Sequence, residues 1–310
     1  MFRVVARCNV GRPMLLLVLT AAIVFLFPDN ALAWGPITHI VHGSGVLASL
    51  ADLPDAVRAV LAANQSCYLY GCIGADIIQA KSYSGDLAGH CHRWPVAWRF
   101  VDEADSDREK AFAWGYMTHL AADILSHNHF VPSSLLRSFA SPALGHAYWE
   151  ARADALQQPS RRELGEKLLT RSFTDCDALV ERVVTRTLLS FKTNKRIFDS
   201  LLAVSRLDRW QAFVKRVSAR SRYELSDDTL ARYNAACIAA AVDLLSEQRQ
   251  SYTQDYDPTG EEVLLRAIAL RRRLRALKRA RRLDPALEAE IAEQMGLEEL
   301  PPDHLSPPQS

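Results

Sequence analysis

The chain has 310 residues, of which 49% are hydrophobic and 24% are charged, a balance typical of globular proteins with a sizeable core. This composition excludes fibrous and largely disordered proteins. The formal net charge of +1 produces no global field that would attract a nucleic acid or an acidic partner, so function has to be sought in local patterns.

The first 33 residues have the order of a secretory signal peptide. Three arginines precede the apolar run 14–27, and small residues up to Ala33 follow. The apolar run is shorter than the roughly 20 residues that a membrane-spanning helix needs, which disfavours a membrane anchor. We therefore expect residues 1–33 to be cleaved as a signal peptide. The mature chain would begin at Trp34 and be exported, either to a periplasm or out of the cell.

Cleavage would leave five cysteines in a compartment where disulfides persist, and an odd number leaves at least one thiol free. These are Cys67, Cys72, Cys91, Cys176 and Cys237. Cys67 and Cys72 are close enough in sequence to pair, but we do not favour that bridge, and their spacing matches no zinc-knuckle pattern. The sequence does not define the pairing.

Residues 34–250 are expected to form an all-α domain. Up to about Gln158, helical patterns alternate with short loops, and this stretch holds eight of the nine histidines. From Arg161 to Gln250, apolar residues recur at intervals of three and four, which indicates amphipathic helices. No internal repeat or strand-like alternation is evident.

The C-terminal part begins with a predicted basic helix over residues 261–283. It carries nine Arg or Lys residues and one apolar stripe, formed by Val263, Ala267, Leu270, Leu274 and Leu277. Helices with a single apolar stripe are routine in globular proteins, so we favour packing of this stripe on the body over binding to a membrane surface. The proline-containing residues 301–310 are expected to be disordered.

Histidine and carboxylate pairs at helical spacing are the main chemical signal. His119 and Asp123 lie four residues apart, hence on one face of a helix, and His127 would extend that face by four more residues. A carboxylate buried there needs a partner, which a metal ion can supply. Alone, the pair would also suit an ordinary core or surface contact. His146 and Glu150 repeat the spacing, and two such pairs are less expected by chance.

Further candidate ligands lie upstream. Asp76 follows the small-residue segment 71–75, which would form a loop that lets a backbone approach closely. His90 and His92 would face opposite sides of an extended loop, so that one of them binds metal. His39 lies five residues after the expected N-terminus, whose α-amino group has an ordinary pKa of about 8 and becomes a ligand once deprotonated. Such nitrogen and oxygen ligands suit zinc better than calcium or magnesium.

Over residues 34–150 this order of residues resembles the zinc-dependent phospholipase C family, which is related to the fungal single-strand-specific nucleases and to glycosylphosphatidylinositol phospholipase D. Those enzymes are similar in having an N-terminal Trp that binds zinc through its amine and carbonyl. A His, an Asp, a His, an HxxxD pair, another His and an HxxxE or HxxxD pair follow. The matching positions are Trp34, His39, Asp76, His90 or His92, His119 with Asp123, His127 or His129, and His146 with Glu150.

The resemblance implies a multi-helix phospholipase C/nuclease-like bundle with a C-terminal helical extension, holding three zinc ions. Asp123 would bridge two of them. Trp34 and His39 would hold the first ion, and Asp76, a loop histidine and His119 would hold the second.

The third ion would take His127 or His129, together with His146 and Glu150. His129 has the spacing of the bacterial phospholipases and His127 that of the glycosylphosphatidylinositol enzyme. We favour His127, because it keeps the helical face. Between the loop histidines, His90 matches the bacterial spacing from Asp76, whereas His92 lies nearer the following helix.

The implied activity is that of an exported zinc-dependent phosphodiester hydrolase, in the first place a phospholipase C. A multizinc site would lower the pKa of a bound water toward neutrality and clamp the phosphoryl oxygens. Asp76 is the candidate for an additional general-base role, and a purely ligating role is equally open. Glu150 as the last ligand, and the pair Thr38-His39, favour a phospholipid substrate.

Two other functions remain open. A single-strand nuclease of the related family would use the basic helix to meet a nucleic-acid backbone instead of an anionic membrane. It would also need aromatic stacking platforms, and core packing explains Trp94, Trp98, Trp114 and Trp149 equally well. The other alternative is a secreted zinc-binding protein without turnover. Nucleic acid is the less favoured substrate, and no protein partner is expected.

Overall fold

The computed structural model describes residues 34–77, 91–138, 142–184, 189–205, 225–282 and 284–287, with 212 and 216 as isolated positions. The expected signal peptide, residues 1–33, and the expected tail, residues 301–310, lie outside this part of the chain. All regular structure in the described ranges is helical, which confirms the all-α prediction. None of the helices described there is long and apolar enough to cross a membrane.

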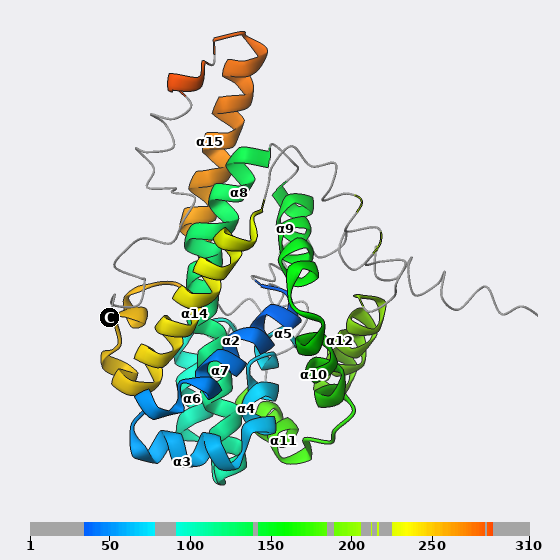
Figure 1. The fold of residues 1–310 in the computed structure, drawn as a ribbon, viewed down its shortest axis with the longest axis vertical. Helices are drawn as coiled ribbons and strands as arrows, with labels where there is room; N and C mark the ends of the chain where they lie inside the picture. The colour runs from blue at the N-terminus through cyan, green and yellow to red at the C-terminus, as the bar shows by residue number, and fades with distance from the viewer. Residues whose placement is uncertain are drawn as a thin grey trace, which may run out of the picture.

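Helix α7 (Asp107–Leu125) runs through the middle of the molecule (Figure 1) and carries His119 and Asp123, two of the candidate ligands. Its residues from Ala111 to Leu125 are buried on all sides, since α2, α3, α4, α5, α6, α11 and α14 all contact it. Those helices are α2 (Pro36–Ala48), α3 (Asp55–Ala63), α4 (Gln65–Gly71), α5 (Gly74–Ile77), α6 (Trp94–Asp102), α11 (Thr174–Val183) and α14 (Asp227–Glu247). The remaining long helices lie around this core and are α8 (Val131–Ser138), α9 (Pro142–Leu156), α10 (Pro159–Leu169), α12 (Phe191–Ser205) and α15 (Glu261–Arg279).

Short single-turn elements connect some of these helices. Within the described ranges, three are 3₁₀ turns, at Leu50–Asp52, Gln248–Gln250 and Tyr252–Asp255. The fourth, η4 (Ser126–Phe130), is a π-helical turn that continues α7 directly into α8. Such turns inside a helix are found often at functional sites.

The start of α7 is set by its own sequence. Ser106 precedes the helix, and its hydroxyl accepts a hydrogen bond from the backbone N–H of Glu109 at 3.2 Å. The Glu109 carboxylate accepts one from the backbone N–H of Asp105 at 2.8 Å. This is close to a capping box, which satisfies N–H groups that the first helical turn leaves without partners.

Helices α4 and α7 cross at two glycines that allow their backbones to touch. A Cβ on Gly115 would lie 2.9 Å from the nitrogen of Cys72 and closer still to the carbonyl oxygen of Tyr68. A Cβ on Gly71 would meet the carbonyl of Phe112 in the same way. The expected loop at 71–75 is shortened to a turn at 72–73, and the close backbone approach expected of its small residues takes place at Gly71. Gly71 ends α4 and α5 begins at Gly74, so the small residues serve helix packing.

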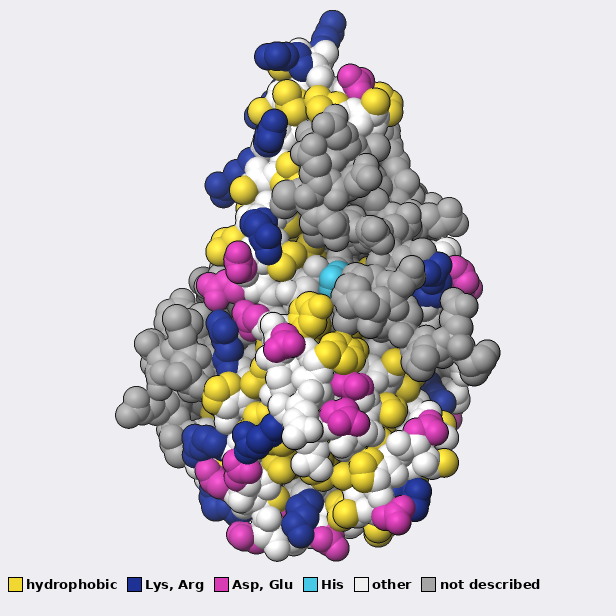
Figure 2. Space-filling view, turned by 90° about the vertical axis from the view of Figure 1, so that its left-hand side faces the viewer, with side chains coloured by type: hydrophobic (Ala, Val, Ile, Leu, Met, Phe, Trp, Pro, Cys, Tyr) yellow, Lys and Arg dark blue, Asp and Glu magenta, His cyan; other side chains and the backbone are white. Residues whose placement is uncertain are grey.

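Helix α15 lies beside α8 and projects from one end of the molecule (Figure 1). Leu270 and Leu274 form a small buried cluster with Leu136 of α8. Most of the basic side chains of α15 are exposed, and Figure 2 shows Lys and Arg gathered on this projection. The apolar stripe is thus used for packing, and the charged faces remain at the surface.

Candidate metal centre

Two ligand candidates come from the middle of α7. His119 and Asp123 are separated by one helical turn, and both side chains are buried because other helices surround α7. The Nε2 atom of His119 lies 3.2 Å from Oδ2 of Asp123. His119 and Asp123 therefore share one inward face of α7, as the sequence predicted.

The orientation of His119 is fixed from α4. Its Nδ1 lies 2.8 Å from the backbone carbonyl of Cys72, and because a carbonyl only accepts, Nδ1 carries the proton and donates. Neutral imidazole then has its lone pair on Nε2, which faces the neighbouring acids. Metal-binding histidines are held in just this way by a backbone or carboxylate acceptor.

Four donor atoms converge around that lone pair. They are Nε2 of His92, Nε2 of His119, Oδ1 of Asp76 and Oδ2 of Asp123. Five of the six distances among them are 3.1 Å (His92–His119), 3.2 Å (His119–Asp123), 3.4 Å (His92–Asp76), 3.4 Å (His92–Asp123) and 3.8 Å (His119–Asp76). Ligands about 2.0–2.1 Å from a tetrahedral zinc ion lie roughly 3.3 Å from one another. These five separations are of the size found between the ligands of a tetrahedral zinc ion, and we refer to the four residues as the cage.

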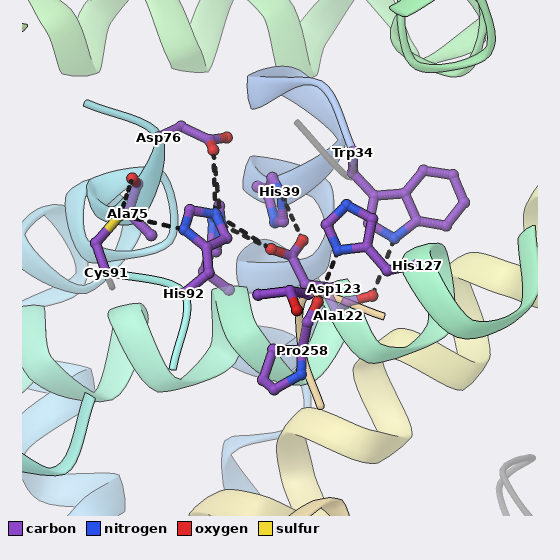
Figure 3. A network of polar contacts seen from close by, with 12 residues as sticks. Trp34, His39, Ala75, Asp76, Cys91, His92, Ala122, Asp123, His127 and Pro258 are labelled. Carbon is purple, nitrogen blue, oxygen red and sulfur yellow. Dashed lines mark hydrogen bonds and ion pairs between the residues drawn. The ribbon is translucent and has the colours of Figure 1, made fainter. Parts of the chain in front are cut away.

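The other oxygen of Asp123 faces a different histidine. Its Oδ1 lies 3.4 Å from Nε2 of His39, which comes from α2. The rings of His39 and His119 stack with their centroids 3.8 Å apart. Asp123 thus points one oxygen at His39 and the other at His92 and His119, the orientation that a bridging carboxylate needs (Figure 3).

The buried polar atoms fit a bound cation. Neither oxygen of Asp123 and neither ring nitrogen of His39 takes part in a well-formed hydrogen bond. Buried carboxylates are costly unless they are hydrogen-bonded, paired or bound to a metal. Two overlapping sets of three donors lie close enough to hold an ion: His39 with Asp76 and His119, and His92 with His119 and Asp123. Nitrogen and oxygen donors of this kind are typical zinc ligands.

The pKa values of these groups depend on each other. Burial lowers the pKa of His39, and the neighbouring His119 lowers it further. For His119 burial also acts downward, but the carboxylates of Asp123 and Asp76 outweigh it and raise the pKa. Burial acts to raise the pKa of Asp123, yet His119 and His39 hold it well below its usual range. Asp123 therefore keeps a negative charge in the core, where a cation would be stabilised.

Trp34, the expected first residue of the mature chain, is anchored next to this cluster. Its side chain is fully buried, and its indole Nε1 donates to the backbone carbonyl of Ala122 at 3.1 Å. Its ring stacks on Phe130 with centroids 4.6 Å apart. Because Ala122 precedes Asp123, residue 34 lies beside the proposed bridging carboxylate, as Figure 3 shows.

His127 and His129 both lie in the π-helical turn η4. We expected His127 to continue the face of α7 at α-helical spacing, but the α-helix ends at Leu125. His127 is buried, and its Nδ1 donates to the carbonyl of Pro258 at 2.7 Å, which leaves Nε2 as its lone-pair nitrogen. His129 is partly exposed. The choice between them remains a prediction, with His127 held in the manner of a metal ligand and lying beside Trp34 and Asp123 in Figure 3.

The other candidates are described only in part. His92 belongs to the four-donor cage, whereas His90 lies outside the described residues. Glu150 is buried on α9, but the side chain of His146 lies outside the described part, as does its geometry relative to Glu150. The expected third ion therefore remains a prediction.

Sequence reasoning missed residues that support the site from a distance. Asp154 accepts hydrogen bonds at the first turn of α2, from the backbone N–H of Thr38 at 2.9 Å and its hydroxyl at 2.6 Å. His42 is buried next to His39 and forms a 3.0 Å hydrogen bond with Asn234 of α14. The spacing of His39 and His42 was visible in the sequence, but both contacts join residues more than 100 positions apart.

The comparison with known families agrees with this geometry. The model of a family described as zinc-dependent phospholipase C matches residues 38–198, just over half of the chain. The chain therefore belongs to the zinc-dependent phospholipase C family, as the sequence resemblance implied. No curated protein and no solved structure matches it. Membership supports a phospholipase C-type hydrolase that uses zinc and acts on phospholipids.

Proposed function

We propose that the exported, processed protein is a phospholipase C that begins at Trp34 and hydrolyses membrane phospholipids with three bound zinc ions. The observation that carries the proposal is the buried cage of His92, His119, Asp76 and Asp123, in which the two histidine nitrogens lie 3.1–3.8 Å from each other and from both carboxylates, as zinc ligands do.

The residues divide among the ions as follows. His39, the amine and carbonyl of Trp34, and Oδ1 of Asp123 would hold one ion. The cage would hold the second, so that Asp123 bridges the pair. His127 or His129, with His146 and Glu150, would hold the third. When bound, zinc supplies Lewis-acid polarisation of a phosphoryl group and lowers the pKa of water.

The chain's own groups prepare this site before substrate arrives. The carbonyl of Cys72 keeps the Nε2 lone pair of His119 directed into the cage, and that of Pro258 does the same for His127. Asp76 is the candidate general base. Its Oδ1 is one of the cage donors, and its carboxylate would in addition accept the proton of the water that attacks phosphorus. The products would be diacylglycerol and the phosphorylated head group.

The position of α15 supports a membrane-bound substrate. The turn Asp257–Gly260 packs on His127, and α15 begins directly after it. Helix α15 thus starts next to His127, and its exposed Arg and Lys side chains gather on the projection seen in Figure 2. Near an anionic membrane, each such charge would contribute about 1 kcal/mol of attraction.

The nuclease alternative has less support from the aromatic residues. Trp98, Trp114 and Trp149 are buried, with at most 8% of the side chain exposed. Trp94 is partly buried, and its indole donates to the carbonyl of Tyr256 at 2.9 Å. These rings are engaged in packing, which leaves them poorly suited as stacking platforms for bases.

The test measures how fast the natively processed protein hydrolyses each of two substrates. We expect release of diacylglycerol from phosphatidylcholine vesicles that exceeds any cleavage of single-stranded DNA, and loss of both zinc and activity in His119→Ala. Inclusion of anionic lipid in the vesicles should raise the rate, and salt should reduce that gain. Preferential cleavage of DNA would refute the phospholipase proposal in favour of the nuclease alternative. A zinc-loaded protein with neither activity would indicate a zinc-binding protein without turnover.

Asp76→Asn separates the two roles of Asp76. If Asp76 also accepts the proton, kcat stays low after the variant is reloaded with zinc; if it is only a ligand, reloading with excess zinc restores kcat. Asp175→Asn is the matched control, because Asp175 pairs with Arg108 on the surface and lies on α11. It should leave both zinc content and activity unchanged.

A further inference from the structure

Two cysteines meet where α4 and α11 touch. Cys67 of α4 and Cys176 of α11 are buried, with 2% and 0% exposure, and the two thiols are close enough that each shifts the pKa of the other. Cys67 does not face Cys72, the neighbour that the sequence suggested. The thiol of Cys72 contacts the hydroxyl of Tyr68 instead.

Contacts around the two thiols fix the position of α4 relative to α11. Tyr70, one turn after Cys67, stacks on Phe173 with ring centroids 4.3 Å apart. Its hydroxyl donates to Asp177, the residue after Cys176, at 2.6 Å. Lys195 also pairs with Asp177, at 2.5 Å. The approach of α4 to α11 is therefore fixed by groups other than the thiols.

The surroundings of the docked pair act differently on the two thiols. The hydrogen bond from Cys176 lowers the pKa of Cys67, and the nearby Arg108 guanidinium lowers it further. The hydrogen bond to Cys67 and burial raise the pKa of Cys176. In the docked pair Cys67 is therefore the more acidic thiol and Cys176 the less acidic one.

We propose that Cys67 and Cys176 form a disulfide that joins α4 to α11 in the exported protein. The oxidant is a disulfide of the thiol–disulfide oxidoreductase class. The Cys67 thiolate attacks it, releases one donor thiol and forms a mixed disulfide. Cys176 then loses its proton and displaces the second donor thiol, so that the bond forms and two electrons pass to the donor. Because both thiols are buried, exchange precedes the docking of the two helices.

The bond would close a loop from α4 to α11 that contains His92, His119 and Asp123. A cross-link over about 100 residues restricts the unfolded chain strongly and so favours the folded state. It would also tie down α4, whose end supplies the Cys72 carbonyl to His119. This role rests on the proposed export, because disulfides persist in oxidising compartments.

Peptide mapping without reductant tests the pairing. The exported protein, with its N-terminus confirmed at Trp34, is alkylated, digested and analysed by mass spectrometry. We expect a linked peptide that contains Cys67 and Cys176, and we expect it also in Cys72→Ser. Reduction should lower the melting temperature by roughly 5–15 °C and have no such effect on the double variant Cys67→Ser/Cys176→Ser.

Alkylated, unlinked Cys67 and Cys176 in the exported protein would overturn the proposal. If the purified chain still begins before Trp34, the export proposal fails instead. The pairing is then judged after refolding with oxidised glutathione, where the same linked peptide is expected and its absence is equally decisive. The two failures are therefore distinguishable.

A second observation concerns the segment between Trp34 and His39. The carboxylate of Asp154 accepts the backbone N–H groups of Ile37 and Thr38 at 3.3 and 2.9 Å. It also lies against Gly35, where a Cβ would be 2.5 Å from Oδ1 and closer to the other carboxyl atoms. Gly35 has φ of −66°, a conformation open to any residue, so glycine is required here for the close approach alone.

We infer that Asp154 is a positioning residue that clamps this segment and thereby places both Trp34 and His39 for metal binding. The inference rests on the proposed zinc role of those two residues. Asp154 binds no ion in this assignment. It acts through the backbone of α2, whose first turn follows directly from the expected mature N-terminus.

Zinc competition with a chromogenic chelator tests the clamp without an activity assay. We expect Asp154→Ala and Gly35→Ala each to weaken retention of one zinc equivalent by 10-fold or more, the range typical for residues that orient metal ligands. Asp154→Asn, which keeps an acceptor for Thr38, should recover most of the affinity. The double variant Gly35→Ala/Asp154→Ala should be no weaker than Asp154→Ala, because the clash is gone.

Zinc affinity of Asp154→Ala equal to that of the parent protein would refute the clamp. Additive losses in the double variant would also refute it. A parent protein that binds no zinc would refute the proposed function, which is a separate result. Circular dichroism of each variant reports whether the fold itself has been lost.

Discussion

Replacement of Gly115 by alanine tests how closely the metal centre depends on helix packing. A Cβ there would lie 2.9 Å from both the nitrogen of Cys72 and the Cα of Gly71, about 0.5 Å inside ordinary contact, and closer still to a backbone oxygen. These are backbone atoms, so α4 and α7 must separate. Overpacking of this kind costs about 3 kcal/mol. Alanine gains about 1 kcal/mol of helix propensity, which leaves a net loss of about 2 kcal/mol in the free energy of unfolding.

Gly165→Ala is the matched control. Gly165 is also buried within a helix and gains the same propensity, but its Cβ would meet only the flexible ends of Ile40 and Ile37, at 3.0 and 3.1 Å. Its free energy of unfolding should change by no more than about 1 kcal/mol.

Denaturant unfolding and zinc titration of both variants provide the assay. Gly115→Ala should also lose zinc affinity, by roughly 10- to 100-fold, because Cys72 is displaced from His119. If Gly115→Ala matches Gly165→Ala in stability and binds zinc normally, the argument that the glycine crossing positions the site is refuted.

Three further predictions follow from single residues. Burial lowers the pKa of His42 to about 3, so this group contributes stability above its unfolded pKa of 6.5 that is lost as pH falls toward 3. Between pH 6.5 and 4.5 the loss is about 2 kcal/mol. His42→Gln, which retains a donor for Asn234, should show that much less decline over the same range. Parallel pH curves would contradict this. Asp123→Asn should abolish binding of at least one zinc equivalent, whereas Asp175→Asn should bind as much zinc as the parent protein. Equal zinc content in the two variants would count against a bridging Asp123. Chelation should lower the melting temperature of the parent protein, because zinc binds the folded chain, and should leave that of Asp123→Asn nearly unchanged; equal shifts would show that the stabilising metal lies elsewhere.

The sequence predicted the residues of the centre better than their surroundings. His119 and Asp123 are four residues apart in a helix, so their shared face follows from local geometry alone. Their burial could be anticipated from the apolar residues before them. The assignment of His39 and Asp76 as zinc ligands came from the family resemblance, and the structure brings both within reach of His119.

Other features depend on contacts between distant parts of the chain. The choice of His92 for the cage required the position of the segment before α6 relative to α7. The π-helical turn at Ser126–Phe130 shifts the residues after Asp123 by a step that α-helical periodicity does not contain. The meeting of Cys67 with Cys176 needs α11 to be folded back on α4. In each case the determining interaction is tertiary, and a local pattern carries no signal of it.

Anomalous X-ray diffraction at the zinc edge, from crystals of the natively processed protein, tests the central claim most directly. We predict one peak inside the cage of His92, His119, Asp76 and Asp123, and a second between Asp123, His39 and the free amine of Trp34. A map in which those positions carry no zinc, from protein that hydrolyses phospholipid, would contradict this assignment of the catalytic centre.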